Sequence, residues 1–144
     1  MAGEYDQISH THPYAVAGAR WLANVLGANA WGVALAVGDG NTYPDCMQHQ
    51  VANLVGSLNG SPPILAGAVV EGPNSSATSG VVDHMRLCPG DGTDRFARFN
   101  STAVFRDNLQ SYSTVEPAID LTATSPLAFA RQAADDRARG LGIG

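Results

Sequence analysis

The chain contains no lysine, little charge overall and only two cysteines among its 144 residues. Charged residues make up 15% and hydrophobic residues 44%, a balance that is typical of a folded globular protein and excludes a disordered chain or a coiled coil. A chain of this length suits one domain. The formal net charge of -5 disfavours nucleic acids and anionic membranes as partners, because both need a cationic surface.

Long apolar runs are also missing. No run reaches the roughly 20 residues that a membrane-spanning helix requires, so we expect no membrane partner. The start, Met1-Ala2-Gly3-Glu4-Tyr5-Asp6, has neither the basic nor the apolar region of a signal peptide. The two cysteines, Cys46 and Cys88, fit either one disulfide or two buried free thiols.

Two segments have the pattern of helices. Residues 1–11 are polar, and we expect them to be disordered or frayed. From His12-Pro13 onward, apolar residues at helical spacing predict a helix that ends at Gly27. A last helix is predicted to begin near Ser125-Pro126, a helix cap followed by a proline in the first turn, and to run toward residue 139.

The chain between these helices is mostly irregular. Residues 31–37 are apolar and fit a short strand or a buried extended segment, which ends in the turn Gly38-Asp39-Gly40-Asn41. Residues 44–100 are rich in Pro, Gly, Asn and Ser, with only short apolar islands. So much irregular chain inside a compact domain indicates functional loops and argues against a self-sufficient helical bundle.

A polar segment near the end carries two carboxyl groups and aromatic rings. It reads Phe105-Arg106-Asp107-Asn108-Leu109-Gln110-Ser111-Tyr112-Ser113-Thr114-Val115-Glu116-Pro117-Ala118. Cleavage of a glycosidic bond needs a carboxylic acid that protonates the leaving oxygen and a carboxylate that activates water, and an aromatic ring can stack on a sugar. On spacing alone, however, residues 113–116 also fit a capping box, in which Glu116 only bonds a helix amide. Asp107 alone fits an exposed loop carboxylate paired with Arg106, and Tyr112 fits a core anchor.

The spacing of this segment resembles the second active-site signature of glycoside hydrolase family 9, a cellulase family. That signature runs aromatic, any residue, Asp, four residues, aromatic, three residues, Glu, any residue and a small residue, and residues 105–118 meet every position. Two further stretches occur in the family's order. Residues 26–32 resemble its Leu-Gly-x-Asn-Pro-aromatic-Gly, and residues 65–73 resemble its Tyr-Gly-Ala-Leu-Val-Gly-Gly-Pro.

The resemblance implies an all-α, loop-rich fold. Residues 12–139 would form the C-terminal portion of an (α/α)6 barrel, a six-hairpin toroid, and residues 140–144 would form a tail. The family's first active-site signature closes with a small apolar residue, His, any residue and Arg, where this chain has Met47-Gln48-His49-Gln50. Gln can bond sugar hydroxyls but neither carries the charge of Arg nor titrates like His.

The same resemblance assigns roles to the polar side chains. Glu116 would be the general acid and Asp107 a supporting carboxylate in the hydrolysis of β-1,4-linked, cellulose-like glucan with inversion. Gln48, His49, Gln50 and Tyr112 would contact the substrate, a β-glucan oligosaccharide or polysaccharide, although His49 alone also fits an ordinary, partly buried histidine.

The family's catalytic base, one of two Asp residues in an Asp-Ala-Gly-Asp-like motif, has no counterpart here, because Asp135-Asp136 falls on the last predicted helix. We therefore expect a fragment that lacks the base and whose exposed apolar faces pair with the missing barrel or with another copy. The alternative is a non-catalytic carbohydrate-binding or interaction fragment of a decayed barrel.

No organic cofactor is expected, since water is the nucleophile. The resemblance makes structural calcium a possibility, but Asp91-Gly92-Thr93-Asp94 lacks the further ligands of a calcium loop, so no metal site is predicted. The family implies a secreted enzyme, which a Cys46–Cys88 disulfide would suit, whereas this chain shows no signal peptide.

Overall fold

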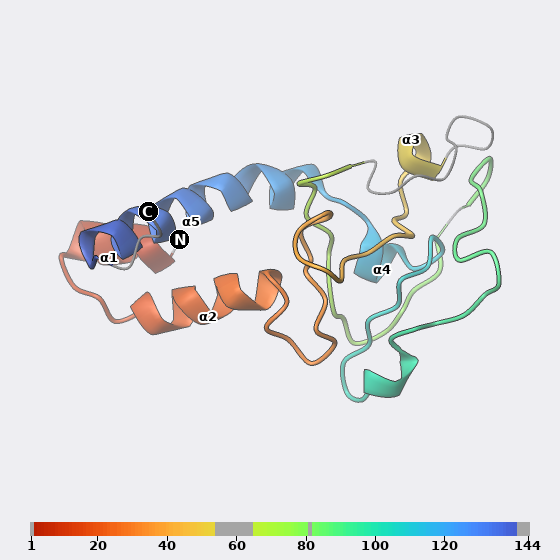
Figure 1. Cartoon of the computed structure of the whole chain (residues 1–144), viewed down its shortest axis with the longest axis horizontal. Helices are drawn as coiled ribbons and strands as arrows, with labels where there is room; N and C mark the ends of the chain where they lie inside the picture. The colour runs from red at the N-terminus through yellow and green to blue at the C-terminus, as the bar shows by residue number, and fades with distance from the viewer. Residues whose placement is uncertain (1, 54–64, 81, 141–144) are drawn as a thin grey trace.

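A computed structural model of the chain describes residues 2–53, 65–80 and 82–140, which form a helical arm beside a loop-rich core (Figure 1). The helical arm consists of α1 (Ala2–Ser9), α2 (Ala15–Val25) and α5 (Ile119–Ala138). The loop-rich core, residues 26–117, holds the short helices α3 (Gln50–Asn53) and α4 (Tyr112–Val115) and the 3-10 helix η1 (Ala97–Phe99). These residues contain helices and no β-strand, which agrees with the expected all-α, loop-rich class.

Helix α1 corrects the expectation that residues 1–11 are disordered or frayed. Asp6 is buried, and its Oδ1 accepts a hydrogen bond from the Tyr14 N–H at 3.4 Å. The rings of Tyr5 and Tyr14 meet edge to face with centroids 5.3 Å apart, and Gln7 accepts a hydrogen bond from Arg131 of α5. These contacts hold α1 against the rest of the helical arm, and the polar composition of the segment did not reveal them.

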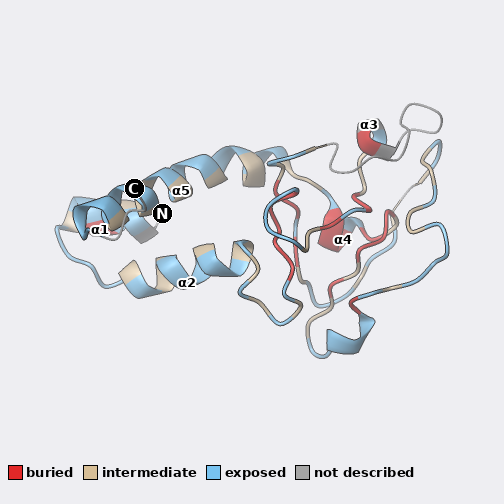
Figure 2. Cartoon of the chain, viewed as in Figure 1, coloured by how far each residue is buried: buried red, intermediate tan, exposed pale blue. Residues whose placement is uncertain are grey.

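Helix α2 ends as the sequence predicts, but its apolar stripe is not buried. Gly27 follows the helix with φ +105°, a conformation that glycine adopts readily. Neither α2 nor α5 has a buried residue, and Trp21 is 63% exposed. Figure 2 shows the contrast between the exposed helical arm and the buried segments of the loop-rich core.

Helix α5 begins at Ile119, earlier than the start predicted near Ser125-Pro126, so Pro126 lies inside the helix. Proline has no N–H with which to bond the carbonyl four residues before it, here that of Thr122. The Ser125 hydroxyl donates to this oxygen instead, at 2.9 Å. Ser125 therefore replaces the hydrogen bond that Pro126 cannot make inside the helix, although a serine before a proline is typical of a helix start.

Three extended segments lie side by side in the loop-rich core. Ala36 forms an antiparallel bridge with Val69, and Val70 forms one with Pro117. Residues 33–37 are all buried, whereas Trp31 is half-buried and Gly32 is exposed. The interpretation of residues 31–37 as a buried segment therefore holds for residues 33–37, and no β-strand forms among the described residues. Val69 and Val70 lie within the stretch 65–73, Pro117 lies within 105–118, and Ala36 follows the stretch 26–32. The bridges therefore bring together the three parts of the chain that resemble the family.

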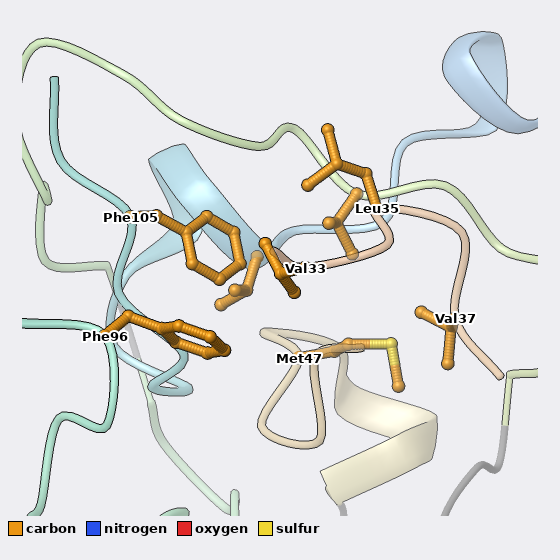
Figure 3. Close-up of a cluster of buried hydrophobic side chains, with 8 residues drawn as sticks. Val33, Leu35, Val37, Met47, Phe96 and Phe105 are labelled. Atoms are coloured by element: carbon orange, nitrogen blue, oxygen red, sulfur yellow. The ribbon is translucent and has the colours of Figure 1, made fainter. Parts of the chain in front are cut away.

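The hydrophobic cluster of the loop-rich core gathers on these segments (Figure 3). The rings of Phe96 and Phe105 meet edge to face, with centroids 5.1 Å apart. Burying a large apolar side chain contributes roughly 1.5–3 kcal/mol. Met47 and Val115 belong to the cluster and directly precede Gln48 and Glu116. The buried core therefore fixes the backbone positions of Gln48 and Glu116. The members are Val33, Leu35, Val37, Met47, Val70, Phe96, Phe105 and Val115.

Candidate functional site

A hollow of about 590 Å³ lies on the loop-rich core. Its volume is within the range of about 300–1,000 Å³ that is usual for ligand pockets. Five of the six predicted catalytic and substrate-binding residues line it together, and Asp107 does not. The lining residues, which define the hollow below, are Gln48, His49, Gln50, Gly80, Met85, Tyr112 and Glu116.

Glu116 is exposed and directly follows α4. Its N–H donates to the Tyr112 carbonyl at 3.1 Å, and its own carbonyl accepts from the Glu71 N–H at 3.1 Å. Among the described residues, its carboxyl group has no hydrogen-bond partner. The backbone is thus held on both sides while the carboxyl group is free to meet a ligand in the hollow.

The capping-box alternative for Glu116 does not occur. Ser113 lies inside α4, where its hydroxyl donates to the Ser76 carbonyl at 3.0 Å and accepts from the Thr78 N–H at 2.9 Å. Helix α4 has no side-chain cap at its start. Glu116 therefore follows the C-terminal end of a short helix instead of closing an N-terminal end.

The segment that carries Gln48, His49 and Gln50 runs along one wall of the hollow. The Gln48 N–H donates to the Val115 carbonyl at 3.2 Å, which ties this wall to the residue before Glu116. His49 is half-buried and directly precedes α3, and its Nδ1 accepts from the N–H of Ala52 in that helix at 3.3 Å. This bond leaves Nε2 as the ring nitrogen that is available to a ligand.

Asp107 is buried, does not line the hollow, and holds the segment that leads to Gln48. Its Oδ1 accepts from the Cys46 N–H at 2.9 Å, and its Oδ2 accepts from the Asp45 N–H at 3.1 Å and from Arg95 at 2.8 Å. Burial raises the pKa of the Asp107 carboxyl above its ordinary value, although both amides and Arg95 favour the ionised form. The exposed loop carboxylate paired with Arg106 is therefore the wrong alternative, because the partner is Arg95.

Cys46 and Cys88 form a disulfide, with their Cα atoms 5.2 Å apart. Cys46 lies just before Gln48 in the chain, and Cys88 lies just after Met85. The bond therefore links two walls of the hollow. Closing a loop with a sequence separation of 42 stabilises the fold by about 4 kcal/mol in the chain-entropy model.

No motif in the sequence indicated that Gly80, Met85 and Arg95 belong to the site or its support. The Gly80 N–H donates to the Gln110 carbonyl at 2.7 Å. A Cβ atom on Gly80 would overlap the Gln48 amide and lie 3.0 Å from Cδ1 of Tyr112. These residues act through contacts with distant segments, so no local pattern marks them.

The other two stretches that resemble the family have structural roles. The Asn29 amide donates to the carbonyls of Asn24 at 2.9 Å and Val33 at 2.7 Å, which fixes the turn after α2. Gly72 has φ +85°, and a Cβ atom there would lie 2.7 Å from Cδ1 of Leu35. Both stretches therefore position the core on which the hollow is built.

The sequence model of glycosyl hydrolase family 9 matches residues 1–129 of the chain. The chain belongs to glycosyl hydrolase family 9. No curated protein and no solved structure matches it. Family membership makes glycoside hydrolysis the class of activity and a carbohydrate the class of substrate.

Family 9 proteins are typically extracellular. In the part of the chain that the structure describes, no helix is long and apolar enough to cross a bilayer. Within the same residues, His, Cys, Asp and Glu side chains do not gather in groups of three or more that could hold a metal ion. Residues 141–144 of the expected tail lie outside the described residues.

Proposed function

We propose that this family 9 chain serves the hydrolysis of β-1,4-linked glucan with inversion, with Glu116 as the proton donor. The observation that carries the proposal is the exposed carboxyl group of Glu116, which lines the hollow on a backbone held by Tyr112 and Glu71. An inverting hydrolase needs such an acid to protonate the leaving oxygen. A fixed backbone keeps the acid in one place while a polysaccharide passes.

The other lining residues supply contacts that a sugar can use. The amides of Gln48 and Gln50 donate to and accept from hydroxyl groups, and His49 offers Nε2. Tyr112, which is 38% exposed, offers a ring face on which a pyranose can stack. Asp107 supports the reaction at a distance, because it is buried against the segment before Gln48 and does not line the hollow.

The catalytic base comes from outside this chain in our proposal. Among the lining residues of the hollow, Glu116 is the one that carries a carboxyl group. Inversion requires a second carboxylate about 6.5–9.5 Å from the acid. The rest of an (α/α)6 barrel, or a partner chain, would supply it. Secretion would place the enzyme where its disulfide is stable.

The single carboxyl group also favours a second function. A chain that supplies the general acid without the base would bind carbohydrate without turnover, as a non-catalytic binding or interaction fragment. The two functions differ in one measurable property, which is the release of reducing ends from a soluble β-glucan.

Hydrolysis of a soluble β-1,4-glucan should be measured for the wild-type sequence, Glu116→Gln and Glu71→Gln, each within the complete barrel or complex that supplies the base. Glu71 is a matched control, because it is an exposed glutamate that contacts the Glu116 backbone without lining the hollow. Loss of a general acid lowers the rate by about 10²–10⁴-fold. We expect this loss for Glu116→Gln only, with the α-anomer as the first product. Turnover that survives Glu116→Gln would refute the role of Glu116, and glucan retention without turnover would favour the binding fragment.

A further inference from the structure

We propose that Met85 is an oxidation site, at which a peroxide converts the thioether to a sulfoxide and thereby weakens sugar binding in the hollow. The oxidation follows from where Met85 lies in the fold. Its effect on sugar rests on the proposed function, because it concerns the ligand of the same hollow.

The two methionines that the structure describes have opposite environments. Met85 is half-buried and lines the hollow, so a small solute that enters the hollow reaches it. Met47 is 3% exposed and belongs to the hydrophobic cluster, so only a local opening of the core would expose it. The third methionine, Met1, lies outside the described residues. A peroxide should therefore discriminate between Met85 and Met47.

No thiol competes with Met85 for the oxidant, because both cysteines of the chain are joined in the Cys46–Cys88 disulfide. In the reaction with hydrogen peroxide, a lone pair of the Met85 sulfur bonds to one peroxide oxygen, and the O–O bond breaks. The proton of the transferred oxygen passes through solvent to the departing oxygen, which leaves as water. The sulfur thus loses two electrons and the peroxide gains them.

The segment that carries Met85 is tied to the loop-rich core on both sides. The Met85 N–H donates to the Val82 carbonyl at 3.0 Å. Three residues later, Cys88 is joined to Cys46, and its carbonyl accepts from the Leu109 N–H at 3.0 Å. The backbone therefore keeps the oxidised side chain at the wall of the hollow.

Oxidation changes what Met85 offers to a ligand. The thioether is apolar and polarisable, whereas the sulfoxide is polar and carries an oxygen that accepts hydrogen bonds. A sugar ring packs its C–H groups on apolar surface, which Met85 and the Tyr112 ring supply among the described lining residues. Packing the same C–H groups against the sulfoxide would remove water from its oxygen without supplying a donor in exchange. We therefore expect oxidation to weaken binding.

Treatment of the full chain with hydrogen peroxide, followed by peptide mass spectrometry, identifies the site. Once the disulfide has been reduced, cleavage before aspartates separates Met47, in residues 45–82, from Met85, in residues 83–90. We expect residues 83–90 to gain one oxygen at least about tenfold faster than residues 45–82, because Met47 must first be exposed by local opening.

Calorimetric titration with a neutral β-1,4-gluco-oligosaccharide, before and after peroxide, measures the effect on binding. For the wild-type chain the Kd should rise by about tenfold on treatment. In Met85→Leu, which conserves volume and forms no sulfoxide, the ratio of the two Kd values should be near one. Met47→Leu is the matched control and should keep the wild-type ratio. Met85→Gln places a polar group at this position without oxidation and should bind like the treated wild-type chain.

Each outcome bears on the proposal. Equal rates of oxidation at Met85 and Met47 overturn the assignment of the site. An unchanged Kd when Met85 is oxidised overturns the effect on sugar and leaves the proposed function standing. A loss of affinity that persists in Met85→Leu also overturns the effect, because another residue would then be responsible. If the untreated chain binds no sugar, the proposed function fails and the effect on sugar fails with it, whereas the peptide map still decides the site.

Discussion

Replacing Gly80 with alanine should damage carbohydrate binding more than it damages the fold. The added Cβ atom would overlap the amide of Gln48 and lie 3.0 Å from Cδ1 of Tyr112. Both neighbours line the hollow, and the Gln48 amide is the far end of a flexible side chain that can move away. The substitution therefore displaces the proposed sugar contacts while it leaves the hydrophobic cluster intact.

The expected magnitudes differ for folding and for binding. Overpacking costs about 1–3 kcal/mol, and the low end applies where a side-chain terminus yields. A Gly→Ala change also stiffens the unfolded chain, which offsets about 0.4–1 kcal/mol of that cost. The net loss in the free energy of unfolding should be about 1 kcal/mol or less. Losing one hydrogen bond from Gln48 and one stacking contact from Tyr112 should cost roughly 2 kcal/mol of binding, which is about 30-fold in Kd.

Urea denaturation and titration with a neutral β-1,4-gluco-oligosaccharide measure the two quantities separately. Gly90→Ala is the matched control, because a Cβ atom at Gly90 has nothing within 4 Å and the backbone there has no positive φ. The control should bind like the wild-type chain and be equally stable or slightly more stable. If Gly80→Ala also binds within twofold of the wild type, Gln48 and Tyr112 do not form the sugar contacts that we propose.

Three further substitutions test the support of the hollow. Asp107→Asn should lower the free energy of unfolding by about 3 kcal/mol in urea titrations, because the buried carboxylate accepts from three donors and an amide replaces one of its oxygens with a donor. A loss below about 1 kcal/mol would contradict the stabilising role of these three hydrogen bonds. Cys88→Ser should cost about 4 kcal/mol in the same titrations and make stability insensitive to a reductant, whereas an unchanged midpoint would show that the disulfide contributes little. Gly72→Ala should cost about 1–3 kcal/mol more than Gly67→Ala in thermal unfolding, because both positions have positive φ but only Gly72 has a Leu35 methyl group against its missing side chain; equal costs would refute this packing argument.

The sequence predicted the lining of the hollow better than its support. Gln48, Tyr112 and Glu116 lie in segments whose residue order is itself distinctive, so a linear pattern was enough to select them. Arg95 and Gly80 matter because of what lies opposite them in space. A pattern along the chain carries no information on such long-range neighbours, and both residues were missed.

The helices show a similar division. The glycine after α2 is a local signal, and it placed the end of that helix correctly. The predicted start of α5 was wrong, because the pair Ser125-Pro126 can begin a helix or can lie inside one, where the serine hydroxyl bonds the carbonyl that proline leaves without a donor. Helix α1 depends on contacts of Asp6 with Tyr14 and of Gln7 with Arg131, which are tertiary interactions that composition does not report.

The disulfide between Cys46 and Cys88 has a consequence for the order in which the protein matures. A newly synthesised chain with both thiols reduced has one fewer tie between the Gln48 wall and the Met85 wall, so its affinity for sugar should be lower until oxidation has taken place. If the hollow binds sugar as we propose, its affinity should rise on oxidation of the two thiols and should stay lower in a reducing cytosol.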